Sequence, residues 1–257
     1  MKKQYKISII GAGNVATHLA RTVLQQPQIE LLQMYNRNVQ KLNEFLSATE
    51  IIDDLSLLKP VDVLIIAIAD DAVHNFSKKI PTIDSLIVHT SGSVSINDLQ
   101  VDRKGVFYPF QSFSKAKKQI DFTDIPILIE AENQNDIELL SNLASILSKN
   151  VQYADSKQRQ ALHIGGVFVA NFTNHLYLQA ENILKDNNLS FDLLKPLIQE
   201  VAQKILTLSS KQAQTGPAIR GDKRIIDKHL KMLNAHQKEI YELLTKSIQQ
   251  TKINTEK

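Results

Sequence analysis

GAGNVA, residues 11–16, is the stretch of this sequence that decides the fold. The apolar run Ile7–Ile10 precedes it, and residues with the pattern of an amphipathic helix follow it from Val15. A strand, a glycine turn and a helix in this order match the G-x-G-x-x-G/A pattern, with Ala16 in place of the third glycine. The stretch predicts a dinucleotide-binding turn; an ordinary strand–helix turn of an α/β protein is the alternative.

Each small residue of this turn has an expected task. Gly11 permits the tight turn, Gly13 lets a pyrophosphate approach the backbone, and Ala16 lets the helix lie close to the strand. The backbone N–H groups of Asn14 and Val15, at the start of the helix, would face the phosphates. We therefore expect Gly11, Gly13, Asn14 and Val15 to bind the cofactor.

The composition limits the classes of protein that this chain can belong to. Its 257 residues suffice for one large or two ordinary domains, and its 43% hydrophobic and 22% charged residues are typical of a globular protein. Without cysteine it has no disulfide, thiolate nucleophile or Cys-ligated zinc. A net charge of +3 does not suggest nucleic acid, and no apolar run approaches the ~20 residues of a membrane span. These features predict a cytoplasmic protein.

The two halves of the chain have different patterns. Short apolar runs alternate with helical patterns as far as residue 154, which predicts a doubly wound α/β domain over residues 1–154. From residue 155 onward we find only helical patterns, which predict a smaller all-helical domain over residues 155–257. The expected strands are Tyr5–Ile10, Glu30–Tyr35, Asp62–Ile68, Leu86–His89, Gly105–Phe110 and Ile125–Glu130. The expected long helices are Val15–Gln25, Gln158–Leu184, Phe191–Leu208 and Ile225–Gln249.

The residues after the second expected strand indicate which dinucleotide binds. An NAD site places an acid there, about 20 residues after the glycines, to hold the ribose 2′-hydroxyl. This chain has no acid between Glu30 and Glu44; it has Asn36 and Arg37 instead. A guanidinium fork suits a 2′-phosphate, with Lys41 assisting one turn later. The sequence therefore predicts NADP as the cofactor, held in part by Asn36 and Arg37.

Two further strand ends are expected to line the same cleft, because ligands of open α/β sheets bind beyond the carboxyl ends of the strands. Ala67 and Ala69 are small enough for a cofactor ribose to lie against the chain. The segment His89-Thr90-Ser91-Gly92-Ser93 is expected to form a polar wall beside the nicotinamide. A capped turn, with Ser93 or Ser95 as N-cap, is a second interpretation that is compatible with the first. The aromatic residues of the next loop, residues 107–114, are expected to serve packing.

The helical half carries a row of polar residues in an apolar stretch. At 100° per residue, His163, Asn171 and Asn174 share one broad face, which either faces the cofactor cleft or finds its partners within a helix bundle. Gly165-Gly166 suggests the close approach of a cofactor or of another helix. Arg220, between two helices, is the candidate for holding an anionic substrate; a rigid helix connection is the alternative.

Two other chemistries find no support in the sequence. The chain has no G-x-S-x-G elbow for a serine hydrolase, and its seven histidines show no metal-ligand spacing. We expect no metal.

Taken together, several motifs resemble those of a bacterial family of Rossmann-like NADP oxidoreductases. The motifs are GAGNVA, Asn36-Arg37, HTSGS, FYPFQSFS, HIGGVFVANFTNHL and TGPAIRGD, in this order. The family is similar to pyrroline-5-carboxylate reductase, ketopantoate reductase and 6-phosphogluconate dehydrogenase-like enzymes. The resemblance implies a helical domain that forms a homodimer and a substrate cleft between the domains. Those relatives place a lysine on the first long interdomain helix, where this chain has His163 and Asn171.

These observations lead to one functional hypothesis and one alternative. The hypothesis is a reductase that transfers hydride from NADPH to a small, carboxylated C=O or C=N compound. His163 or His89 would donate the proton, Asn171 would orient the substrate, and Arg220 and Asn174 would bind it. The alternative is a non-catalytic NADP-binding sensor or scaffold, in which the polar row serves the dimer interface.

Overall fold

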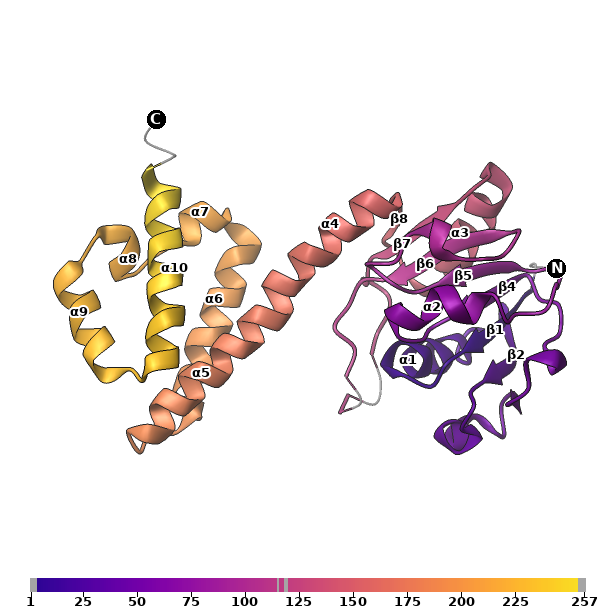
Figure 1. Ribbon diagram of the computed structural model, residues 1–257, viewed down its shortest axis with the longest axis horizontal. Coiled ribbons are helices and arrows are strands. Elements are labelled where there is room, and N and C mark those ends of the chain that lie inside the picture. The colour runs from indigo at the N-terminus through magenta and orange to yellow at the C-terminus, as the bar shows by residue number, and fades with distance from the viewer. Residues whose placement is uncertain (1–3, 115, 118–119, 254–257) are drawn as a thin grey trace. The chain divides into compact units, whose positions relative to one another are not determined.

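The computed structural model describes residues 4–114, 116–117 and 120–253 (Figure 1). Contacts within the chain divide it into two units, residues 1–170 and residues 171–257. The expected boundary between residues 154 and 155 stays a prediction. It coincides with the change from strands to helices, because the last strand ends at Tyr153 and the next helix begins at Ser156.

An eight-stranded sheet forms the centre of the first unit, in the order β3-β2-β1-β4-β5-β6-β7-β8. Strands β1 to β6 are parallel, β7 is antiparallel to β6, and β8 is parallel to β7. The order of the first six strands is that of a doubly wound dinucleotide-binding sheet, so the predicted fold class is confirmed. The strands are β1 (Tyr5–Ile10), β2 (Ile29–Tyr35), β3 (Glu50–Ile52), β4 (Val63–Ile66), β5 (Leu86–His89), β6 (Lys104–Pro109), β7 (Ile127–Ala131) and β8 (Val151–Tyr153).

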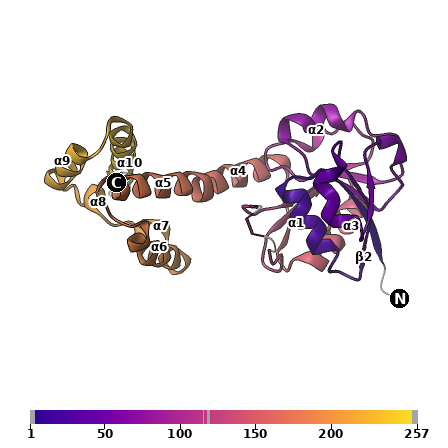
Figure 2. The same ribbon diagram turned by 90° about the horizontal axis from the view of Figure 1, so that it is seen from below.

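Helices cover both faces of this sheet, and each face has its own apolar core (Figure 2). Helices α1 (Asn14–Val23) and α3 (Gln134–Leu147) pack on one face, and α2 (Asp70–Ser77) packs on the other. All four residues of β4 are buried, as a strand covered on both sides requires. Three short 3-10 helices complete this part: η1 (Val39–Phe45), η2 (Leu55–Leu57) and η3 (Ile96–Asp98).

The first long helix of the helical half begins in the first unit. Asp155 caps α4 (Ser156–Gly166) through a capping box with Gln158. The helix then passes through the π-helical segment η4 (Val167–Phe172) into α5 (Thr173–Asp186). The division between the units falls inside η4, where the backbone departs from the 3.6-residue repeat.

In the described part of the second unit, every element of regular secondary structure is a helix. One expected helix, Ile225–Gln249, is wrong as a single element. Leu233 is extended and the Asn234 side chain accepts a hydrogen bond from the Gln237 N–H at 3.0 Å, so a new helix begins after it. Besides α5, the unit contains η5 (Phe191–Leu194), α6 (Lys195–Thr207), α7 (Ser210–Ala213), α8 (Pro217–Arg220), α9 (Lys223–Met232) and α10 (Ala235–Ile253). Across the described part of the chain, no helix combines the length and apolarity of a membrane span.

Candidate dinucleotide site

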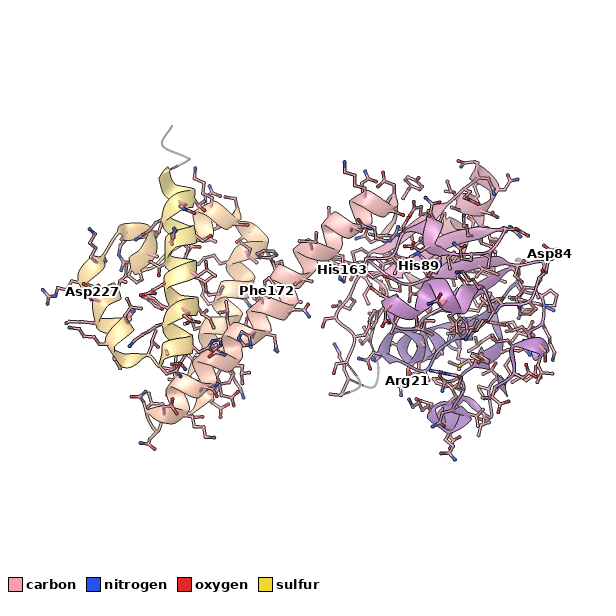
Figure 3. The ribbon with its side chains drawn as sticks, viewed as in Figure 1. Arg21, Asp84, His89, His163, Phe172 and Asp227 are labelled. Atoms are coloured by element: carbon pink, nitrogen blue, oxygen red, sulfur yellow. The ribbon has the colours of Figure 1, made fainter. Side chains whose placement is uncertain are left out.

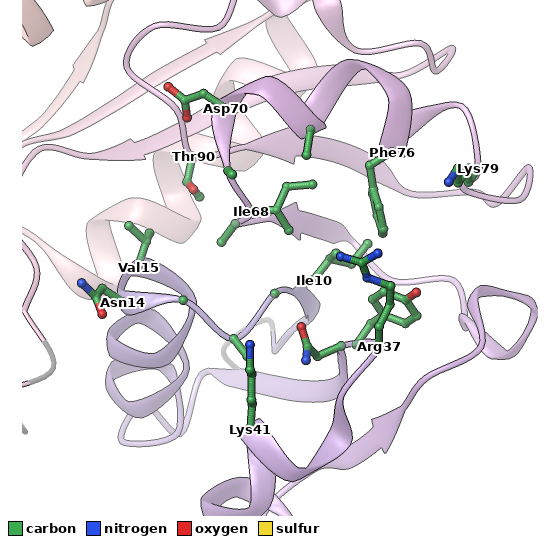
Figure 4. Close-up of a pocket in the computed structure, with 18 of the residues that line it drawn as sticks. Ile10, Asn14, Val15, Arg37, Lys41, Ile68, Asp70, Phe76, Lys79 and Thr90 are labelled. Carbon is green, nitrogen blue, oxygen red and sulfur yellow. The ribbon is translucent and has the colours of Figure 1, made fainter.

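A cavity of about 840 Å³ lies at the carboxyl ends of β1, β2 and β4 (Figure 4). Nearly all the residues predicted to bind the cofactor line it, and Ser91 is the exception. Thr90 and Asp70 lie towards one side of the cavity, and Arg37 and Lys79 lie towards the other. The predicted residues in its lining are Gly11, Gly13, Asn14, Val15, Asn36, Arg37, Ala67, Ala69 and Thr90.

The two glycines of the turn are required for different reasons. Gly11 has a φ of +121°, and a Cβ there would lie 2.2 Å from the Ala67 carbonyl oxygen, so the fold itself demands glycine. Gly13 has an ordinary φ of −80°, and a Cβ there would meet no protein atom within 4 Å. Neither its backbone nor its packing requires glycine. This fits the expectation that a ligand approaches the backbone at Gly13.

The start of α1 is open to an anion. Gly13 is the N-cap and offers no side-chain cap, and the first turn contains no acid. The Asn14 side chain turns away to donate to the Phe113 carbonyl at 2.9 Å, and His18 contacts the Ser114 carbonyl at 3.0 Å. Asn14 therefore offers its backbone N–H to the cavity while its side chain holds the loop after β6.

Three cations from separate elements line the cavity: Arg37 after β2, Lys41 in η1 and Lys79 just after α2. Asn36 lies beside them, and its amide donates to the Asn38 carbonyl at 2.7 Å. Lys79 and Phe76 also line the cavity, but they belong to no sequence motif and reach it only through the packing of α2, so they could not be predicted. The site fits a phosphate-bearing group at this end.

The loop after β5 contributes Thr90 to the cavity, whereas Ser91 serves the loop. The Ser91 hydroxyl accepts hydrogen bonds from the N–H groups of Ser93 at 3.0 Å and Val94 at 3.1 Å. These bonds stabilise the turn after β5. Ser95 caps η3 through a capping box with Asp98, so the capped turn expected from the sequence is present. A role for Ser91 in cofactor binding stays a prediction.

His89 is buried at the end of β5, with no exposed surface. Burial, with the nearby positive charge of Arg159, lowers the pKa of His89 to about 3. Its Nδ1 accepts a hydrogen bond from the Ser91 N–H at 3.1 Å. His89 is thus a neutral imidazole that shapes the loop, and its predicted part in catalysis stays a prediction.

His163 lies on α4 (Figure 3) and is half-buried. It meets two other elements of the first unit. Its Nδ1 lies 3.1 Å from the Tyr108 hydroxyl at the end of β6. Burial, and then the negative charge of Asp70, raises the pKa of Tyr108 to about 12. A Cβ on Gly92 would lie 2.6 Å from Nδ1 and 2.7 Å from the Tyr108 oxygen. Tyr108 was expected only to pack, so its polar contact is new.

A buried ion pair that the sequence did not reveal holds this region together. Arg159 is fully buried and pairs with Glu130 of β7, and it also donates to the carbonyls of Ser91 at 3.1 Å and Val94 at 2.5 Å. Glu130 accepts further bonds from the N–H and hydroxyl of Ser156. The network ties α4 to β7 and to the loop that follows β5.

The remaining predicted residues belong to the second unit. Asn171 lies in η4, Asn174 in α5 and Arg220 at the end of α8, and all three side chains are exposed. The expectation of one shared face with His163 assumed 100° per residue, and η4 does not keep that repeat. Their roles in binding or catalysis stay predictions.

The two neighbouring glycines of α4, Gly165 and Gly166, differ in what surrounds them. A Cβ on Gly166 would lie 2.8 Å from the Phe110 ring, so the close neighbour there is an aromatic side chain of the first unit's own loop. A Cβ on Gly165 would meet nothing within 4 Å. The expected approach of a cofactor or another helix is therefore not needed to explain Gly166.

The described residues contain no group of three or more His, Asp or Glu side chains arranged to hold a metal ion. The sequence expectation of a metal-free site stays a prediction.

Comparison with known proteins places the chain in a family. A Bacteroides fragilis protein, described as a "putative NADP oxidoreductase", is 40% identical; the match covers 97% of this chain and 100% of that one, with a TM-score of 0.88. Residues 125–248 match a family model described as a domain of unknown function, DUF2520. The fold and cavity define a Rossmann-type dinucleotide-binding class. Within it, the chain belongs to the family of this Bacteroides fragilis protein, and the resemblance expected from the sequence is confirmed.

More distant solved structures share the fold. An imine reductase from Myxococcus stipitatus, in complex with NADP⁺, is 14% identical with a TM-score of 0.67, covering 97% of this chain and 93% of that one. A pyrroline carboxylate reductase from Plasmodium falciparum, with NADP bound, is 14% identical with a TM-score of 0.59, covering 97% and 100%. No curated protein matches the chain.

Proposed function

We propose that this protein binds NADPH and reduces a small, anionic ketone or imine by hydride transfer. The observation that carries the proposal is the single cavity that combines the glycine turn with Arg37, Lys41 and Lys79. The open start of α1 suits a pyrophosphate, and the three cations suit a 2′-phosphate. The descriptions of the Bacteroides fragilis relative and of the two distant reductases support the same cofactor here.

The cofactor supplies the hydride, and residues of the chain position the reactants and supply the proton. His163 is the proton donor in this proposal, with Asn171 orienting the substrate and with Arg220 and Asn174 holding its anionic group. His163 is preferred to His89, because a pKa of about 3 keeps His89 neutral and a neutral imidazole is a much weaker acid than an imidazolium.

A homodimer formed through the helical unit belongs to the same proposal. Supporting it, α6 exposes an apolar stripe of residues four apart, Leu197, Val201 and Ile205, whose exposed fractions are 58%, 58% and 46%. Monomeric proteins rarely leave such a continuous apolar surface in water. A cytoplasmic location stays a prediction from the cysteine-free sequence.

Cofactor choice is tested by titrating the full chain with NADPH and NADH and following the fluorescence of the reduced nicotinamide. We expect NADPH to bind more tightly, and Arg37→Asp to reverse the order. Lys78→Asp makes the same charge change beside Lys79 but outside the cavity lining, so it should leave the order unchanged. Equal affinities of the wild-type protein for the two cofactors would contradict the proposal.

Turnover is tested by NADPH oxidation against a panel of keto acids and imines. Oxidation that depends on the added compound supports a reductase, and His163→Ala should then lower kcat. Tight NADPH binding with no turnover across the panel would favour the alternative, a non-catalytic NADP-binding sensor or scaffold.

A further inference from the structure

We propose that Tyr108 is a positioning residue for His163: its hydroxyl hydrogen-bonds to Nδ1, which orients the ring and, while the imidazole is neutral, keeps the ring proton on Nε2. The reaction itself rests on the function proposed above. The hydrogen bond and the tautomer do not, and they can be measured without any substrate.

The pair is built by three separate elements of the first unit. Tyr108 comes from the end of β6, His163 from α4, and Gly92 from the loop after β5. The Tyr108 oxygen and His163 Nδ1 are 3.1 Å apart, and both lie against Gly92, whose φ does not itself require glycine. A methyl group at Gly92 would lie 2.6 Å from one of these atoms and 2.7 Å from the other. Glycine at this position therefore leaves room for the hydrogen bond.

The direction of the hydrogen bond follows from what each partner can offer. Burial and the charge of Asp70 raise the pKa of Tyr108 to about 12, so the phenol keeps its proton and can donate it. Among the described residues, His163 Nδ1 is the hydrogen-bond partner found for the phenol oxygen. If Nδ1 carried the proton, the phenol O–H would lose that acceptor. In a neutral imidazole that accepts at Nδ1, the proton resides on Nε2.

The hydrogen bonds of Arg159 also support the contact between His163 and Tyr108. Arg159 lies four residues before His163, on the same face of α4. It donates to the carbonyls of Ser91 and Val94, which flank Gly92 on either side. The buried pair of Arg159 with Glu130 thus holds α4 and the Gly92 loop in the register that brings His163 to Tyr108.

The pair also lies close to the cavity. Thr90 lines the cavity, and Gly92 is two residues further along the same loop. Two residues of chain span at most about 7 Å. The Tyr108–His163 pair therefore lies near Thr90, which Figure 4 shows on the side of the cavity away from Arg37 and Lys79.

The test is nitrogen-15 NMR of the full chain labelled at histidine, with His163→Gln used to assign the two ring signals of His163. In the wild-type protein, at a pH where the ring is neutral, we expect an unprotonated, hydrogen-bonded Nδ1 and a protonated Nε2. Tyr108→Phe removes only the hydroxyl and should shift the Nδ1 signal to that of a nitrogen without a hydrogen bond. Tyr153→Phe, on an exposed tyrosine of β8, is the matched control and should leave both signals in place. A protonated Nδ1 in the wild type, or unchanged signals in Tyr108→Phe, would overturn the proposal.

Gly92→Ala gives a second, independent perturbation that keeps both polar side chains. The added methyl should separate the pair and reproduce the NMR change of Tyr108→Phe, whereas Gly165→Ala, with open space at its Cβ, should not. With a substrate from the panel, Tyr108→Phe should lower kcat at least tenfold and leave KM within a few-fold. No turnover by the wild type, with the expected NMR signals present, would refute the reductase and leave the hydrogen bond established. A folded Gly92→Ala protein with wild-type signals would contradict the role of Gly92.

Discussion

The two units of this protein differ in how much apolar surface each one buries. The first unit has an apolar core on both faces of its sheet. In the described part of residues 171–257, by contrast, Ala218 and Gln237 are the only buried residues. Leu206 is 84% exposed, Met232 72% and Leu243 69%. The described part of the helical unit therefore has almost no apolar core of its own.

This difference indicates what stabilises each unit. Burying a leucine side chain contributes about 1.5–3 kcal/mol, and a small unit has little else to offset the entropy of folding. The first unit obtains this contribution from its own residues. The helical unit needs apolar surface from elsewhere, which is the physical reason for the homodimer proposed above.

The largest expected effect is on the buried ion pair of the first unit. Arg159→Met leaves the Glu130 carboxylate buried without its partner, so the free energy of unfolding should fall by about 3–5 kcal/mol. Urea unfolding, followed by circular dichroism, measures this loss.

An ion pair of the second unit provides the matched control. Lys195 and Asp192 form a pair at 2.5 Å, with side chains 65% and 72% exposed. Lys195→Met should leave the unfolding curve unchanged, because water already solvates both charges. Equal losses of unfolding free energy in Arg159→Met and Lys195→Met would contradict the prediction that the buried ion pair contributes more stability than the exposed one.

The next effect concerns assembly through the helical unit. Val201 lies in the middle of the apolar stripe on α6 and is 58% exposed. If this stripe is buried in a homodimer, Val201→Glu should weaken dimerisation by about 2–4 kcal/mol, which is roughly a 30- to 1,000-fold rise in the dissociation constant. Sedimentation over a range of concentrations measures the constant.

Leu46→Glu is the control on the first unit, because Leu46 lies outside the apolar stripe of α6 and is 60% exposed. It should not change the dissociation constant. A wild-type chain that stays monomeric at all concentrations would contradict the dimer and leave the exposed stripe without an explanation.

Much of the first unit could be predicted because its signals are local. β1 and β5 have the predicted bounds, and the glycine turn, Arg37 and Thr90 line one cavity as the doubly wound topology requires. β3 and β8 were missed, since three residues are too few to carry a periodic signal. The break in the last expected helix was missed because Asn234 acts as a cap only when the chain bends there.

The third effect is a dependence of stability on pH that arises in the first unit. The pKa of His89 is about 3 in the folded chain and about 6.5 when unfolded. The unfolded state therefore binds more protons between these values, so stability is complete above pH 6.5 and is lost as the pH falls. His89 should contribute a loss of about 2 kcal/mol between pH 7 and pH 5.

Urea unfolding of the wild type and of His89→Asn at both pH values isolates this contribution. The variant should lose less stability between pH 7 and pH 5, by about the 2 kcal/mol assigned to His89. If the wild type and His89→Asn lost equal amounts of stability between pH 7 and pH 5, His89 would have the same pKa in the folded and unfolded chains.

The residues around His163 could not be predicted, because they are brought together by tertiary contacts alone. Arg159 and Glu130 come from α4 and β7 and belong to no motif, and Tyr108 of β6 lies in FYPFQSFS, whose aromatic residues were expected only to pack. Lys79 likewise reaches the cavity only through the packing of α2. A periodic pattern predicts which face a residue occupies, but not which residue of another element it meets.

The smallest effect separates the two glycines of α4, next to the junction of the units. Ala at Gly165 meets no atom within 4 Å and should stabilise the helix by about 0.5–1 kcal/mol. Ala at Gly166 meets the Phe110 ring at 2.8 Å and should destabilise the protein. Thermal unfolding of both variants gives the sign of each change. Loss of stability in Gly165→Ala, only at concentrations where the protein is dimeric, would mean that a second copy approaches α4 at this position. In that case, the second copy that covers the exposed apolar residues of the helical unit would also contact α4 at Gly165.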